Sequence, residues 1–305
     1  MNILSFADTR FPIERANGVQ TMATCRALAA RGHHITLLVK SDSAPAPRDP
    51  FEFYGVTPLP TFAIEAVGPA SARRMQMLWT GLRRSLTSRA DVIYTRDLGL
   101  AALLSRVPRS ARPPVVYESH GIAPVVAAAM PALLGPSAAE PSAQKLARLE
   151  RRESLVWRHA DAYVTITQTL ADDLGMRYGT RTRVFVVPDG AQPSPSARPG
   201  RGYGGASCPP PHSVRAAYAG HLYPWKGVDV FLRALAAAPE VDGLIVGGHP
   251  GEADLARVRA LAQSLNLGDR LTITGLLPPH DVAAALAGAQ VFVLPNIATP
   301  VSERY

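Results

Sequence analysis

Cysteine is nearly absent from this 305-residue chain, which has only Cys25 and Cys208. Two thiols cannot form a disulfide framework, so we expect a protein of a reducing compartment and a cytoplasmic location. Long apolar runs are also missing. The best candidate, residues 122–134, is interrupted by two prolines and is shorter than the roughly 18 apolar residues that a membrane span needs. The first nine residues lack the basic start and long apolar core of a secretory signal.

Lysine is scarce as well, so arginine supplies most of the positive charge behind the formal net charge of +8. That charge favours anionic partners, namely nucleic acid, phosphorylated substrates or an acidic membrane surface. A biased coding composition would give the same arginine content, so charge alone selects no partner. The chain has no basic run with interleaved aromatics and no zinc-type ligand spacing, and we therefore expect neither a nucleic-acid partner nor a metal site.

Short β-rich runs alternate with helical stretches through the first 190 residues. A helix is expected over 17–31, because Met22, Cys25 and Leu28 share one face and Gly32 follows as a stop. Apolar strands that alternate with amphipathic helices predict a parallel sheet covered on both faces. The expected strands are 2–6, 35–39, 92–95, 115–118, 162–166 and 184–187.

Residues 192–212 read QPSPSARPGRGYGGASCPPPH, with almost nothing to bury in a core. We interpret 191–213 as a Pro/Gly/Ser-rich linker between an N-terminal domain, 1–190, and a C-terminal domain, 214–305. Strands are expected in the second domain at 216–219, 244–246, 271–274 and 291–294. The fold predicted is α/β, with two doubly wound, Rossmann-like domains facing a cleft. Because such domains usually have five or six strands, we expect the second to be truncated.

The segment 218–229, YAGHLYPWKGVD, is the most informative stretch of the chain. It leaves a strand, turns through Gly220 and enters a helix near Gly227. Lys226 therefore lies close to the positive end of a helix dipole, which is an unfavourable place for a cation. An anion bound between the lysine and the helix end would reverse this penalty. A solvated lysine in a turn is the alternative.

Two further glycine-rich turns follow expected strands. Gly18 lies at the first strand-to-helix turn, where a missing side chain lets backbone amides approach a phosphate; a plain turn glycine is the alternative. The turn 247–251, GGHPG, includes Gly248 and lacks the spacing of a dinucleotide fingerprint, so no nicotinamide cofactor is predicted. A structural turn explains this segment almost as well.

Polar residues also follow two strands of the first half. Glu118 and His120 lie two positions apart, so in an extended chain they face the same way and suit acid/base work or hydrogen bonds to sugar hydroxyls. A histidine satisfied by loop backbone is the alternative. Arg96 leaves another strand at the same edge. Contact with an anionic acceptor and a salt bridge to Asp97 or another acid both remain open, so Arg96 is not counted as a site residue.

A helix expected over 72–86 carries an apolar stripe of Met75, Leu78, Trp79, Leu82 and Leu86. Its arginines lie away from that stripe. A basic amphipathic helix of this kind can lie on an acidic membrane. We expect instead that the stripe packs on the sheet and that the arginines point into water.

The order of these segments resembles the retaining glycosyltransferases of family 4 (glycosyl transferases group 1), which have the GT-B fold. The segment 218–229 resembles their signature of strand, glycine, short loop and lysine-glycine at a helix start. Residues 187–190, VPDG, resemble the valine-proline-asparagine-glycine turn before the crossing between domains. Residues 2–39 resemble the opening unit of the family. The resemblance spans essentially the whole chain.

The resemblance implies roles for individual residues. Lys226 would bind the diphosphate of a nucleotide-sugar donor and stabilise it as it leaves. His221 stands where the family usually has arginine, so either a protonated His221 or a different donor geometry is implied. His120 would face the donor sugar and the acceptor, which makes His120 and Lys226 the catalytic candidates. The donor-binding candidates are Gly18, Gly220, His221, Lys226 and Gly248.

The implied reaction moves a sugar with retention from a UDP- or GDP-linked donor to a hydroxyl of a glycan, lipid-linked or small-molecule acceptor. It would need no metal or other cofactor, and peripheral contact with the inner membrane surface would suit lipid-linked acceptors. The family carries a glutamate pair after a strand like 291–295. Glu303 lacks the glycine-rich surroundings of that pair, so it is not assigned. Two alternatives remain: a nucleotide-sugar epimerase or hydrolase of the same fold, and an inactive, truncated binding module for sugars or lipids.

Overall fold

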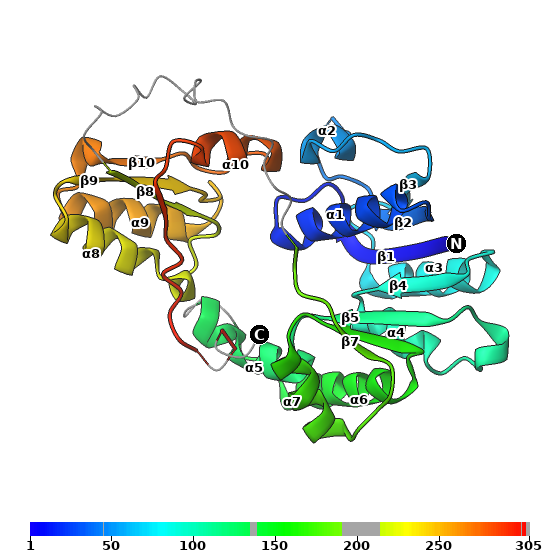
Figure 1. Ribbon diagram of the computed structural model, residues 1–305. Coiled ribbons are helices and arrows are strands. Elements are labelled where there is room, and N and C mark those ends of the chain that lie inside the picture. The colour runs from blue at the N-terminus through cyan, green and yellow to red at the C-terminus, as the bar shows by residue number, and fades with distance from the viewer. Residues whose placement is uncertain (45, 135–138, 191–213, 300, 303–305) are drawn as a thin grey trace. The chain divides into compact units, whose positions relative to one another are not determined.

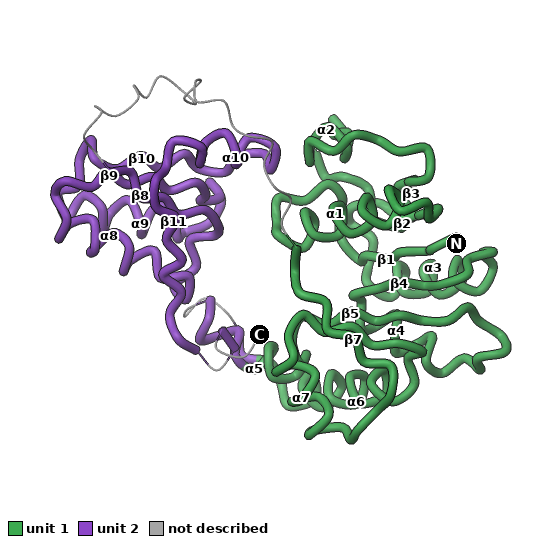
Figure 2. The backbone as a smooth tube through the Cα atoms, in the orientation of Figure 1, with its two compact units in different colours: residues 1–128, 141–190, 304–305 green, residues 129–140, 191–303 purple. Residues whose placement is uncertain are grey.

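A computed structural model describes residues 1–44, 46–134, 139–190, 214–299 and 301–302 (Figure 1). The chain forms two compact units, coloured in Figure 2. Unit 1 contains residues 1–128 and 141–190, and unit 2 contains residues 129–140 and 191–303. The linker predicted at 191–213 lies outside the described residues, as does Glu303. Within the described part of the chain, no helix is long and apolar enough to cross a membrane.

Unit 1 is built on a seven-stranded sheet in the order β3-β2-β1-β4-β5-β6-β7, and every neighbouring pair is parallel. The chain moves outward from β1 in one direction, then returns to start again at β4, so the strand order reverses between β1 and β4. The strands are β1 (Asn2–Arg10), β2 (His34–Lys40), β3 (Phe62–Gly68), β4 (Val92–Thr95), β5 (Val115–Ser119), β6 (Ala162–Thr165) and β7 (Val184–Val186).

Helices cover both faces of this sheet, because alternate strand residues point to opposite sides. Ile3 and Leu37 pack with Met22 of α1, whereas Leu4 and Ile93 pack under α3 and α4. On that second face α4 packs between α3 and α6. The helices are α1 (Ala16–Ala30), α2 (Pro50–Tyr54), α3 (Arg74–Thr87), α4 (Leu98–Leu104), η1 (Arg109–Ala111), α5 (Ala123–Leu134), α6 (Ala143–His159) and α7 (Gln168–Tyr178).

Unit 2 has a smaller parallel sheet, in the order β10-β9-β8-β11. The side chains of Tyr218 and Ile245 pack under α8 and α9, and Leu244 and Val246 pack under α10. The strands are β8 (Val214–Ala219), β9 (Val241–Val246), β10 (Leu271–Ile273) and β11 (Val291–Phe292), and the helices are η2 (Pro224–Lys226), α8 (Val228–Ala237), α9 (Ala253–Ser264), η3 (Gly268–Arg270) and α10 (Pro279–Leu286). The prediction of two Rossmann-like α/β units is confirmed.

The packing of the helix at 72–86 differs from the prediction. It is present as α3, but Met75, Trp79 and Leu86 of the expected buried stripe are 57%, 61% and 40% exposed. The face of α3 that packs on the sheet is instead the one that contains Gly81. A Cβ at Gly81 would lie 2.7 Å from Cε2 of Phe6, so the helix approaches the sheet where it has no side chain. Close approach at this glycine fixes the helix rotation and leaves most of the apolar stripe in solvent.

Candidate functional site

A cavity of about 270 Å³ lies in unit 1 at the point where the strand order reverses. In open parallel sheets this crevice, at the carboxyl ends of the strands, is where ligands bind. Backbone and side chains of β1, β4 and α1 form its wall. The polar residues of that wall include Asp8, Asn17, Thr21, Thr24, Tyr94 and Arg96. Hydroxyl, carboxamide, carboxylate and guanidinium groups together suit a polyhydroxylated ligand.

Two carboxylates of this cavity are neutralised by cations of unit 1. Lys40 Nζ lies 2.8 Å from Asp8 Oδ1, and Arg74 Nη1 lies 2.6 Å from Asp8 Oδ2. Arg74 also approaches Asp97 at 3.1 Å, while Asp97 caps α4 by accepting a hydrogen bond from the Leu100 amide. These contacts hold the ends of β1 and β4 in fixed positions. Because Asp97 pairs with Arg74, Arg96 pairs with another acid, as the sequence analysis also allowed.

Arg96 instead approaches Glu118. Its Nε lies 3.7 Å from Glu118 Oε1, and its Nη1 donates to Gln20 Oε1 at 3.1 Å. Burial lowers the pKa of Arg96, although a guanidinium stays charged in proteins. Tyr94 donates its hydroxyl to Glu118 Oε2. Arg96 was left out of the candidate site, and the structure places it in the cavity wall.

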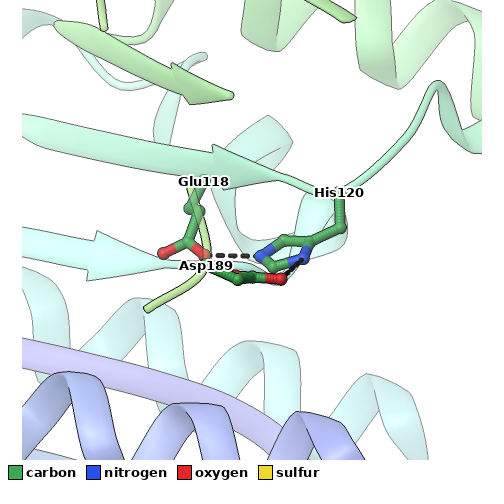
Figure 3. A group of neighbouring side chains, drawn as sticks. All are labelled: Glu118, His120 and Asp189. Carbon is green, nitrogen blue, oxygen red and sulfur yellow. Dashed lines mark hydrogen bonds and ion pairs between the residues drawn. The ribbon is translucent and has the colours of Figure 1, made fainter. Parts of the chain in front are cut away.

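Glu118 and His120 face the same way at the end of β5 and contact each other directly. His120 Nε2 lies 2.5 Å from Glu118 Oε1, and Asp189 Oδ2 lies 3.9 Å from His120 Nδ1 (Figure 3). Asp189 comes from the VPDG turn that follows β7. The loops after β5 and β7 therefore place one imidazole between two carboxylates. A neighbouring carboxylate fixes the ring orientation of a histidine, as acid/base chemistry requires.

These three side chains also resemble a metal-ligand set, since one ligand atom from each lies within 4.8 Å of the others. The contact between Glu118 and His120 argues against a preformed metal site. Two atoms that both bind one metal at about 2.1 Å in a tetrahedron or octahedron lie about 3 Å or more apart, so this hydrogen bond would have to open. The absence of a metal requirement stays a prediction.

Gly18 has a packing reason for lacking a side chain. It is buried in the first turn of α1, where a Cβ would clash with the Tyr54 hydroxyl and with the Ile13 side chain. The Tyr54 hydroxyl in turn donates to the Ile13 carbonyl at 2.8 Å and accepts from its amide at 2.9 Å. The structural alternative for Gly18 is therefore supported, and its role toward a phosphate stays a prediction.

In unit 2, Lys226 lies where the sequence predicted it, directly before a helix. It ends the short helix η2, and Gly227, with φ of +69°, caps the N-terminus of α8. Its Nζ lies 4.0 Å from the ring centroid of Trp225. Burial lowers the pKa of Lys226, and it forms no ion pair within the part of the chain that the structure describes. A partly buried cation at a positive helix end is an electrostatic cost that a bound anion would remove.

The loops after β8 and β9 meet beside this lysine. Gly220 has φ of +146° and Gly247 has φ of +149°, and a Cβ on Gly247 would clash with the Gly220 carbonyl. Gly248 packs against Leu222, with a Cβ position 2.9 Å from Leu222 Cδ1. These glycines let the two backbones touch, so the predicted residues Gly220, His221 and Gly248 come together at one edge of the sheet.

Glu252 is a site residue that the sequence reasoning missed. It occupies the N-cap position of α9 without a side-chain capping hydrogen bond, and its Oε2 lies 3.7 Å from His221 Nδ1. The His221 ring stacks on Tyr223 at a centroid distance of 4.8 Å. A carboxylate at the N-cap of the helix after the GGHPG turn was the available signal. Its approach to His221 depends on the pairing of β8 with β9, which sequence alone does not give.

Comparison with known proteins identifies this arrangement. The glycosyl transferase 4-like domain matches residues 17–190, and the glycosyl transferases group 1 domain matches residues 210–303. D-inositol 3-phosphate glycosyltransferase of Acidothermus cellulolyticus is 31% identical over 199 residues, which are 60% of this chain and 42% of that protein. The chain therefore matches less than half the length of this relative.

Solved structures of the same fold cover nearly the whole chain. Sucrose-phosphate synthase from Thermosynechococcus elongatus superposes with a TM-score of 0.70 at 18% identity, over 98% of this chain and 76% of that one. HepE from Anabaena in complex with UDP-glucose gives 0.65 at 18% identity, over 98% and 74%. WaaG, described as a glycosyltransferase involved in lipopolysaccharide biosynthesis, gives 0.63 at 17% identity, over 96% and 75%. These similarities establish the GT-B fold.

Proposed function

The chain belongs to the glycosyl transferase 4-like family, and from this premise we propose that it is a retaining glycosyltransferase using a nucleoside diphosphate sugar. The observation that carries the proposal is Lys226, a partly buried cation before the N-terminus of α8 with no ion pair in the described residues. A diphosphate is the anion whose charge and size suit such a place. The lysine would stabilise it as the sugar–phosphate bond breaks.

The donor would bind unit 2 at the carboxyl ends of β8 and β9. Gly220 exposes backbone there, as phosphate-binding loops require, and the buried Gly248 holds the neighbouring loop against Leu222. His221 would stand beside the diphosphate. Because Glu252 already lies 3.7 Å from its Nδ1, a proton on this imidazole would be compensated within unit 2. This supports His221 as a protonated substitute for the usual arginine. HepE, one of the structures named above, was solved with UDP-glucose, which supports a nucleoside diphosphate sugar; we propose a UDP- or GDP-linked one.

The acceptor would bind unit 1 in the cavity between β1 and β4, with its hydroxyl groups on Asn17, Thr21 and Asp8. We place His120 at the reacting sugar, oriented by Glu118. The leaving diphosphate would take the proton of the acceptor hydroxyl, so no protein nucleophile is needed. Glycans, lipid-linked sugars and small polyols all present such hydroxyls.

We further propose that no metal or other cofactor takes part and that the protein works in the cytoplasm. Peripheral contact with the inner face of the membrane belongs to the same proposal, and the next subsection identifies the surface that would make it.

Donor binding tests the proposal directly, because Trp225 beside Lys226 reports on that site by its fluorescence. We expect UDP or GDP to quench the wild-type signal and K226A to weaken this binding roughly 10- to 100-fold, the loss of one charged hydrogen bond. K145A is the matched control, since Lys145 lies exposed on α6 in unit 1. Failure of every nucleoside diphosphate to bind the wild type, or equal affinity of K226A, would refute the proposal.

Product analysis separates the alternatives. A transferase forms glycoside only when an acceptor is present, whereas an epimerase or hydrolase converts the nucleotide sugar without one. A binding module binds the nucleotide or a glycan and turns over neither. Incubating nucleotide sugars with and without an acceptor mixture, followed by chromatography, distinguishes these outcomes.

A further inference from the structure

Helix α3 exposes three large apolar side chains on one side of unit 1. Met75, Trp79 and Leu86 are 57%, 61% and 40% exposed, and their spacing of four and seven residues places them in a single stripe along the helix. The opposite side of α3 is buried on the sheet through Met77 and Leu78. The stripe is therefore not needed for the core of unit 1.

Arginines occur on α3 outside this stripe and on the helices packed beside α3. The neighbouring helices of the same layer, α4 and α6, add to those of α3, because α4 packs between α3 and α6. None of the following arginines forms an ion pair with a carboxylate within the described residues: Arg73, Arg83, Arg89, Arg106, Arg148 and Arg152. We call Met75, Trp79, Leu86 and these six arginines the α3 surface.

The carboxylates of this layer already have other partners. Glu65 pairs with Arg84, and Glu150 accepts two hydrogen bonds from Arg177. The pKa of Arg152 is lowered, first by burial and then by repulsion from neighbouring arginines, of which Arg148 has the largest effect. The α3 surface therefore carries uncompensated positive charge next to exposed apolar groups.

This combination selects among anionic partners. Nucleic acid would neutralise the arginines but would leave methionine and leucine in water. An anionic bilayer accommodates both, because its phosphates lie beside the apolar boundary where tryptophan prefers to sit. We propose that the α3 surface docks unit 1 on an anionic lipid bilayer, with Met75, Trp79 and Leu86 entering the headgroup–acyl boundary and the arginines contacting lipid phosphates. The inference locates the membrane contact proposed above and does not depend on sugar transfer.

Vesicle binding tests the proposal with the full chain. We expect co-sedimentation with phosphatidylcholine vesicles that contain phosphatidylglycerol, little with phosphatidylcholine alone, and weaker binding at high salt. The double variant M75S/W79S should bind anionic vesicles at least roughly tenfold more weakly than the wild type. M176S is the matched control, because Met176 is 78% exposed on α7, outside the α3 surface, and should bind like the wild type.

Trp79 provides a second readout. It should show a blue-shifted emission on anionic vesicles, and W79F should lose this shift, since Trp157 is buried at 2% exposure and Trp225 belongs to unit 2, outside the α3 surface. No binding to anionic vesicles, equal binding by M75S/W79S, or an equal loss in M176S would overturn the proposal. Nucleoside diphosphate binding by M75S/W79S should match the wild type, so failure of membrane docking and failure of the proposed function give different results.

Discussion

Replacing Glu153 by glutamine should remove a large part of the pH dependence of stability in unit 1. Glu153 lies on α6 with 0% exposure and pairs with no cation in the described residues. Among the described residues its carboxylate accepts hydrogen bonds from the Tyr163 hydroxyl, at 2.7 Å, and the Ala123 amide, at 2.9 Å. Burial is the main cause that raises the pKa of Glu153 from 4.5 to about 7, and these two hydrogen bonds oppose it.

The direction follows from proton linkage. The folded chain holds the Glu153 proton more tightly than the unfolded chain, so its contribution to stability is complete below about pH 4.5 and is lost as the pH rises through about 7. Each pKa unit is worth about 1.4 kcal/mol, so the full loss is about 3 kcal/mol. Roughly 2.5 kcal/mol of it should fall between about pH 5 and pH 8.

Urea denaturation of wild type and E153Q at several pH values, followed by the fluorescence of nearby Trp157, measures this difference. Glutamine cannot ionise, so the free energy of unfolding of E153Q relative to wild type should rise by roughly 2.5 kcal/mol from about pH 5 to pH 8. E150Q is the matched control on the same helix. Hydrogen bonding from Arg177 is the main cause that lowers the pKa of Glu150, so its effect should stay constant in this range. Parallel pH profiles for wild type and E153Q would refute the reasoning.

Three further predictions concern backbone, charge and thiol. G227A should destabilise unit 2 by about 2 kcal/mol or more, because φ is +69° and the new methyl would clash with a carbonyl after β11; an unchanged urea midpoint would contradict this. D161N should cost unit 1 about 3 kcal/mol in urea denaturation, since Arg112, paired at 2.5 Å, would stay buried and unpaired; a loss below about 1 kcal/mol would contradict it. Burial raises the pKa of Cys25 to about 12. In a C208S variant, Cys25 of the native chain should therefore react more slowly with thiol reagents than Cys25 of the chain unfolded in urea. Equal labelling rates for the two states would contradict this.

Local sequence patterns predicted most strands, because buried parallel strands are short apolar runs. The strand β3 was missed. It reads FAIEAVG, contains Glu65 and lies at the edge of the sheet, where only Phe62 is fully buried. A half-exposed edge strand needs fewer apolar residues, so its signal is weaker than that of a central strand.

The local sequence pattern could not predict which face of α3 is buried, for a different reason. Its apolar stripe indicates an amphipathic helix but not which neighbour covers the stripe. Contact between Gly81 and Phe6 decides the outcome, and these residues are far apart in sequence. The same physical fact turns an expected core face into an exposed surface that includes Trp79.

Some residues of the candidate site could be placed together from local sequence, and others could not. Gly220 and Lys226 are close in sequence, so one strand–loop–helix pattern was enough to place them together. His120 with Asp189, and His221 with Glu252, come from separate strand ends. Their meeting depends on the order of strands in each sheet, which a single sequence does not contain.

The two units differ in how their charges are balanced. In unit 1 the cavity carboxylate Asp8 is compensated by Lys40 and Arg74, so its charge is balanced without a ligand. In unit 2 Lys226 is partly desolvated at a positive helix end and has no ion pair in the described residues. A ligand of opposite charge would offset that cost, and whatever binds the folded unit alone also stabilises it. Recognition of the proposed diphosphate and stability of unit 2 would therefore be two aspects of one interaction, whereas the proposed hydroxyl recognition in unit 1 would rest on a site already held in place by its own ion pairs.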